Sequence, residues 1–123
     1  MVYYIQGGEI NLDINKEMIK GYIESIILCL LKDEDLYGYE ISKIVRSMSE
    51  ETFEIKEGTL YVVLKRLEKG NLVLSYWGGD DKSRGGRRRY YKITNDGLNY
   101  IIRKKEEWIF FKKIIDTFFK GGV

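Results

Sequence analysis

The sequence predicts a mainly α-helical α+β domain, in which three amphipathic helices precede a β-hairpin and one long helix follows it. Two observations predict this class. Apolar residues recur at helical spacing in four segments, and the one stretch rich in alternating, β-branched and aromatic residues is split by a glycine-rich run. Because the chain has 123 residues, we expect one hydrophobic core.

The N-terminal third is expected to hold an arm and a first helix. Segment 1–15 shows no clear period, which predicts a mostly irregular arm. Over 16–32 the apolar residues return every three or four positions, and Asn15 is placed to cap a helix there. Cys29 lies in an unbroken apolar run of this helix and is expected to be a buried thiol, unable to form an intrachain disulfide.

Two shorter helices follow. Apolar residues at i, i+4, i+7 and i+8 predict a second helix over about 38–49. Leucines at i, i+4 and i+7 predict a third helix over 57–69, and Gly70 with Asn71 is a plausible stop. These spacings give each helix one apolar face for the core.

A hairpin and a long helix complete the chain. Segments 72–77 and 87–94 have strand composition, and the four glycines of 78–86 predict a long mobile tip between them. Thr94 can cap a final helix over 95–120, about 39 Å long at 1.5 Å per residue.

This order of elements is that of a winged helix-turn-helix with a two-stranded wing and a long C-terminal extension. In such a domain the third helix enters the major groove of DNA, and the wing lies along phosphates or the adjacent minor groove. We therefore expect three parts: an arm at 1–15, a DNA-binding domain at 16–94 and a dimerisation helix at 95–123.

Charge is concentrated on the third helix and the hairpin. The whole chain carries only +2, but segment 56–92 holds ten basic and four acidic residues, a net +6, and the other 86 residues carry −4. A basic face of this kind favours phosphate contacts and counterion release. The residues expected to contact DNA are Tyr39, Lys43, Lys56, Gly58, Thr59, Val62, Lys65, Arg66, Lys69, Lys82, Arg84, Arg87 and Arg88.

The strand that follows the tip contains three consecutive arginines. Because side chains alternate along a strand, Arg89 shares a side with Tyr91 and Ile93 and is expected to pair with an acidic neighbour. For the basic face as a whole, an ordinary solvated surface is the alternative to a DNA contact.

The last helix has more apolar residues than one small domain can cover. Ile101, Trp108 and Ile115 recur every seven residues, and Phe111 and Phe118 lie at intervening positions. A self-complementary contact between two copies, with the first helix of the other subunit on the far side, would bury this stripe. The alternative is that the helix packs back on its own domain.

Composition excludes several other classes. Without histidine the chain cannot build Ser-His-Asp or Cys-His nucleophile systems or the commonest zinc sites, and no other catalytic pair or metal cluster is recognisable. We expect no enzyme activity, cofactor or metal. No signal peptide is visible and the longest apolar run, six residues at 26–31, is too short to span a bilayer, so a cytoplasmic protein without membrane contact is expected.

Four motifs together resemble the PadR-like transcriptional regulators over about residues 16–120. They are LYGYEI at 36–41, EGTLY with LKRLE at 57–68, SYWG at 75–78 and GGRRRYYKIT at 85–94. The resemblance implies a homodimeric winged-helix DNA binder, usually a repressor of a nearby promoter, whose C-terminal helix dimerises. A single long C-terminal helix is similar to the short subgroup, which includes multidrug-responsive repressors. Val62 departs from the family, since many members carry proline there.

Trp108 has two interpretations. In drug-responsive members an equivalent tryptophan stacks on flat ligands at the dimer centre, which implies a ligand site at Trp108; a core anchor without a ligand is the alternative. Lys112, one turn further on, would disfavour a planar cation. Any effector is therefore expected to be aromatic and either neutral or anionic.

Taken together, these features predict a dimeric regulator that binds a pseudo-palindromic operator, in most cases to repress, and that releases it when an aromatic ligand binds. Such a ligand can act only through different affinities for two dimer arrangements. The alternative function is a winged-helix assembly module whose basic face meets an acidic protein.

Overall fold

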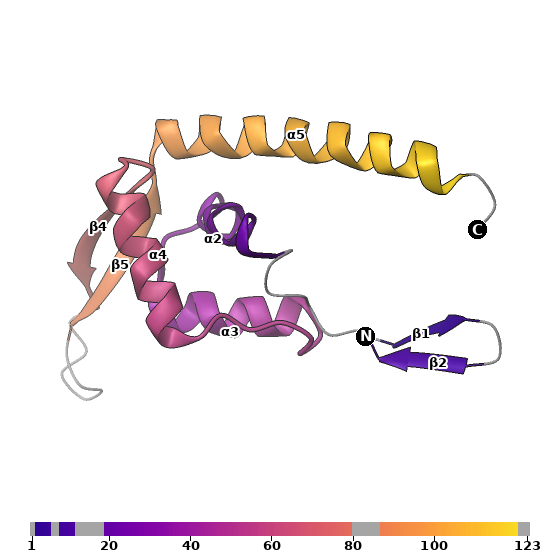
Figure 1. Cartoon of the computed structure of the whole chain (residues 1–123). Coiled ribbons are helices and arrows are strands. Elements are labelled where there is room, and N and C mark those ends of the chain that lie inside the picture. The colour runs from indigo at the N-terminus through magenta and orange to yellow at the C-terminus, as the bar shows by residue number, and fades with distance from the viewer. Residues whose placement is uncertain (1, 6–7, 12–18, 80–86, 121–123) are drawn as a thin grey trace.

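The computed structural model describes residues 2–5, 8–11, 19–79 and 87–120. Three short helices pack together, a small sheet lies at one end, and one long helix runs past them (Figure 1). The elements are β1 (Val2–Ile5), β2 (Gly8–Asn11), α2 (Ile23–Leu31), β3 (Leu36–Tyr37), α3 (Gly38–Met48), α4 (Glu57–Lys69), β4 (Val73–Gly78), β5 (Arg88–Ile93) and α5 (Asn95–Phe119). Within these ranges no helix combines the length and apolar character needed to cross a membrane.

The core lies between α2, α3 and α4 and includes the three leucines that the helical spacing selected on α4. Leu60, Leu64 and Leu67 of α4 are all fully buried, as predicted, together with Ile27 and Leu28 of α2. Complete burial of one such side chain contributes about 1.5–3 kcal/mol to the stability of the fold.

The start of α3 lies close to the Tyr61 side chain of α4. A Cβ added to Gly38 would lie 2.6 Å from the Tyr61 hydroxyl oxygen, so a side chain there would displace the Tyr61 ring from this position. The backbone N–H of Tyr37 donates to Glu40 Oε1 at 3.2 Å and closes the first turn of α3. The closeness of Gly38 to Tyr61 brings the motif at 36–41 next to the motif at 57–61.

The predicted ends of the last two helices are confirmed. Asn71 follows α4 with a φ of +60°, a left-handed conformation that ends the helix. At the start of α5, Thr94 Oγ1 accepts a hydrogen bond from the backbone N–H of Gly97 at 3.0 Å. A threonine N-cap of this kind stabilises a helix by about 1 kcal/mol.

The two predicted strands of the hairpin are confirmed, and a third strand joins them. β5 is the central strand, in the order β3-β5-β4, and both pairings are antiparallel. β3 consists of two residues and was not predicted, because two residues are too few to show alternation. It ties the segment between α2 and α3 to the base of the hairpin.

The first predicted helix is shorter than its pattern suggested. The helix predicted over 16–32 is interrupted: Ile19 and Lys20 are helical, the chain turns at Gly21 and Tyr22, and α2 begins at Ile23. The Tyr22 N–H donates to the Ile19 carbonyl at 2.8 Å and closes that turn. Glycine loses little on leaving a helix, so Gly21 is a favourable place for the break. Asn15 lies outside the described residues.

Two further expectations were wrong. The arm at 1–15, expected to be mostly irregular, contains the antiparallel pair β1 and β2, each only four residues long and therefore too short for a readable period. Cys29, expected to be buried, is exposed, because the core-facing side of α2 carries Ile27, Leu28 and Leu31 while Cys29 faces the space beside α5.

Candidate nucleic-acid interface

The side of α4 opposite its leucines forms an exposed polar and basic surface. On a helical wheel of 100° per residue, the residues opposite these leucines are Gly58, Thr59, Val62, Lys65, Arg66 and Lys69, and all six are exposed. Burial of the leucine face against α2 and α3 fixes which side of α4 points outward. In a winged helix-turn-helix this outward side is the one that enters the major groove.

Other expected contacts lie around the start of α4. Lys56 precedes its first turn and provides no side-chain cap, so the first backbone N–H groups are open to an anion such as phosphate. Tyr39 and Lys43 on α3 are exposed and line a small hollow of about 110 Å³. Arg46 and the acidic Glu54 line the same hollow.

The hairpin is anchored to α4 through Glu68. This carboxylate accepts a hydrogen bond from Ser75 Oγ of β4 and lies 3.5 Å from Arg89 Nη2 of β5. The predicted pairing of Arg89 with an acidic neighbour is thus confirmed, and its guanidinium also lies 5.5 Å from the centre of the Trp77 ring. An exposed ion pair contributes only about 0–1 kcal/mol to stability. The main consequence of the two Glu68 contacts is that they join both strands of the hairpin to α4.

The two other described arginines of the wing, Arg87 and Arg88, differ in exposure. Arg88 stacks with its guanidinium 4.9 Å from the centre of the Tyr37 ring and is half-buried, while Arg87 is exposed. Lys82 and Arg84 lie outside the described residues.

A cluster of tyrosines at the base of the hairpin was not anticipated. Tyr37 stacks near Tyr39 and meets Tyr90 edge to face, and Tyr90 stacks on its cross-strand partner Tyr76. The Tyr76 hydroxyl donates to Asp35, and this hydrogen bond is the main reason that the pKa of Tyr76 rises to about 12. Alternation shows which residues of a strand share a face, but it does not give the register between two strands. The pairing of Tyr76 with Tyr90 therefore could not be predicted.

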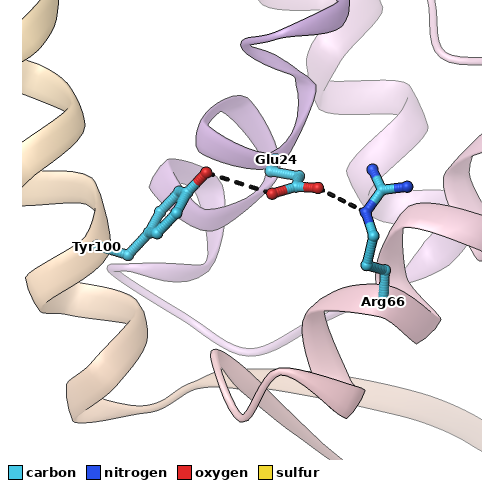
Figure 2. A network of polar contacts seen from close by, with 3 residues as sticks. All are labelled: Glu24, Arg66 and Tyr100. Atoms are coloured by element: carbon cyan, nitrogen blue, oxygen red, sulfur yellow. Dashed lines mark hydrogen bonds and ion pairs between the residues drawn. The ribbon is translucent and has the colours of Figure 1, made fainter.

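Arg66 is held by a partner that the sequence did not indicate. Its Nε lies 2.6 Å from Glu24 Oε1 of α2, and the Tyr100 hydroxyl of α5 donates to the other carboxylate oxygen at 3.3 Å (Figure 2). Burial, followed by the nearby Glu24 charge, raises the pKa of Tyr100, so its hydroxyl stays protonated and can donate. One carboxylate therefore links α4 to α5.

The far part of α5 presents an uncovered apolar face. Trp108, Phe111, Ile115 and Phe118 are exposed, with Phe118 the most exposed at 78%. Ile101 is different: it was expected at a dimer contact, but it is 9% exposed and belongs to the core of its own chain. Its position near the start of α5, beside α2, is the reason.

A cavity of about 570 Å³ lies between α2 and α5. Its lining includes Tyr22, Cys29 and Trp108, and the Tyr22 and Trp108 rings meet edge to face at 5.6 Å. Lys112, expected at the ligand site, does not line this cavity and instead pairs with Asp116 at 2.8 Å, because the two residues are one helical turn apart. Among the described residues, the basic ones that line this cavity are Lys32, Lys104 and Lys105.

The three-helix core, the hairpin tied to the third helix and the exposed basic face of that helix define a winged helix-turn-helix DNA-binding protein. Residues 27–103 match the transcriptional regulator PadR-like family, so the chain belongs to that family. Its members are DNA-binding transcription regulators and not enzymes.

Solved structures of regulators agree with this assignment. A transcriptional regulator from Clostridium thermocellum is 47% identical, with a TM-score of 0.75 over 83% of this chain and 97% of that one. A PadR family transcription regulator from Clostridium difficile is 46% identical, with a TM-score of 0.70 over 80% of this chain and 99% of that one.

A relative is also found by sequence alone. An uncharacterized protein X of Lysinibacillus sphaericus is 44% identical over 88% of this chain and 97% of its own length.

Proposed function

We propose that this regulator acts as a homodimer, binds a pseudo-palindromic operator and represses transcription from it. The observation that carries this proposal is the position of the exposed basic face of α4 beside a hairpin whose base Glu68 anchors to the same helix. Two such surfaces, one in each subunit, would read two half-sites related by the same two-fold axis.

The uncovered face of α5 supports the dimer. Trp108, Phe111, Ile115 and Phe118 form an apolar stripe on a helix that extends past the short helices (Figure 1). Exposed apolar side chains gathered on one element are typical of a surface that contacts another protein. A second copy that packs on this stripe would also set the distance between the two α4 helices.

The cavity beside Trp108 supports an effector. It combines aromatic walls with three lysines, an environment that favours a flat ligand that is neutral or anionic and disfavours a cation. Because it is bounded by α2 and α5, a ligand there would act on the element proposed to dimerise. The ligand would release the operator if it bound more tightly to a dimer arrangement in which the distance between the two α4 helices does not match the distance between the half-sites.

A salt titration tests the DNA-binding surface. We expect the logarithm of the association constant for duplex DNA to fall linearly with the logarithm of salt concentration, and each lost phosphate contact to reduce the slope by about 1. Lys65→Ala and Lys69→Ala should each do so, whereas Lys113→Ala, which removes an exposed lysine of α5, should leave the slope unchanged. Equal binding to duplex DNA and to an acidic polypeptide would favour the assembly module instead.

A further inference from the structure

We propose that Glu24 is a positioning residue for DNA recognition: it orients the guanidinium of Arg66, and Tyr100 holds Glu24 in place. This inference rests on the proposed function, in which the exposed side of α4 faces DNA. The geometry is a chain of two contacts that crosses three helices, from Tyr100 on α5 through Glu24 on α2 to Arg66 on α4 (Figure 2).

The contact between the two charged groups leaves the far end of Arg66 available. Glu24 engages Nε at 2.6 Å, so the two Nη groups, which carry four of the five N–H donors, are not used in this ion pair. Arginine reads guanine through two parallel hydrogen bonds to O6 and N7. A guanidinium gripped at Nε can offer both Nη groups end-on to such a base edge.

Arg66 also shares its surroundings with the other residues expected at the DNA. It lines a hollow of about 550 Å³ together with Gly58, Thr59 and Val62 of α4, and Lys20 lies on the same hollow. The Arg66 side chain is 59% exposed despite the ion pair. Its position is thus fixed without being covered, which reduces the rotamer entropy that it would lose on binding.

A purely structural role for Glu24 makes a different prediction. An exposed ion pair adds little to stability, and a carboxylate near phosphates weakens binding to every duplex alike. Removing the Glu24 charge should therefore raise affinity for any DNA if the residue only repels. If Glu24 orients Arg66, the same change should weaken the specific complex while nonspecific binding stays equal or rises.

The test compares two duplexes of equal length, one selected from a random pool by the full wild-type protein and one scrambled, at one salt concentration. We expect Glu24→Gln to lower the ratio of selected to scrambled affinity about tenfold. In the Arg66→Ala background the same change should alter that ratio less than twofold. Tyr100→Phe, which keeps the ring and removes the donor, should lower it about threefold. Glu107→Gln removes a carboxylate that pairs with Lys104 and should have no effect.

Two results would overturn the inference. One is a ratio that Glu24→Gln leaves unchanged, or changes equally with and without Arg66; the other is an Arg66→Ala variant that discriminates as well as the wild type. If Glu24→Gln does not fold, the Tyr100→Phe variant takes its place, and a ratio of selected to scrambled affinity that Tyr100→Phe leaves unchanged overturns the inference. A wild-type protein that prefers no duplex at all would instead contradict the proposed function.

Discussion

Gly97 lies so close to Leu72 that a Cβ added to the glycine would stand 2.3 Å from the Leu72 carbonyl oxygen. That oxygen also accepts a hydrogen bond from the Thr94 backbone N–H at 3.0 Å. The first turn of α5 is therefore packed against the backbone between α4 and β4 and against the Ile93 side chain. This contact fixes the direction in which the proposed dimerisation helix leaves the DNA-binding domain.

Gly97→Ala is expected to destabilise the protein by about 1–3 kcal/mol, because the added methyl group must displace backbone atoms. Gly58→Ala is the matched control, since a Cβ there meets nothing within 4 Å and alanine is the better helix former by up to about 1 kcal/mol. Urea denaturation of both variants measures the difference. Equal midpoints for Gly97→Ala and the wild type would show that α5 is not held by this contact.

The hydrogen bond between Tyr76 and Asp35 predicts a dependence of stability on alkaline pH. The pKa of Tyr76 is raised from 10.0 to about 12, so the folded state keeps its proton at a pH where the unfolded chain has lost it. The stabilisation is therefore complete below pH 10 and disappears as the pH rises through 12. Ultraviolet titration should show late tyrosines, because the pKa values of Tyr91 and Tyr100 are also raised, and Tyr76→Phe should remove one late transition from the curve.

Asp35→Asn provides the control for that titration. It removes the carboxylate whose hydrogen bond is the largest cause of the shift, and the late transition should move toward 10. An unchanged titration curve in this variant would show that another group raises the pKa of Tyr76.

The apolar stripe of α5 predicts an association defect in Phe118→Glu. Phe118 is the most exposed apolar side chain of that helix, and a charge there would be buried without a partner in a dimer. We expect the dimer dissociation constant, measured by sedimentation equilibrium, to rise about a hundredfold or more. Lys113→Glu should leave it nearly unchanged. Dimers that tolerate Phe118→Glu would place the interface on another face.

The cavity beside Trp108 predicts quenching of tryptophan fluorescence by aromatic effectors. Trp77 is the other tryptophan of the chain, so the Trp77→Phe variant reports on Trp108 alone. Neutral and anionic planar aromatics should change its emission, and a cation of the same ring system should do so more weakly because three lysines line the cavity. No response across such a panel would indicate that Trp108 is a packing residue only.

Helical spacing predicted much of the fold because it reports which residues must face one core. The leucines of α4 return to the same side of the helix at i, i+4 and i+7, and all three are buried. Gly21, by contrast, breaks the first helix although the apolar period continues across it. The period records burial, and a chain can bury the same side chains with or without a continuous backbone helix.

The site was predictable where it depends on local charge and not where it depends on distant pairing. The cations on α4 are visible in the sequence, and the wheel identified which of its residues are exposed. Glu24 and Arg66 are separated by 42 positions, and no periodicity links them. The prediction that Cys29 is buried was wrong for a similar reason. The exposure of Cys29 depends on how α5 passes α2, which the sequence near Cys29 does not indicate.

Selection of duplexes from a random pool, followed by sedimentation of the complex, tests the central claim most directly. A homodimer with two α4 helices related by a two-fold axis should enrich an inverted repeat, with half-site centres about 10 base pairs apart or a multiple of that, and should bind as two chains per duplex. A pool that shows no enrichment, or a complex with one chain on a single half-site, would contradict it.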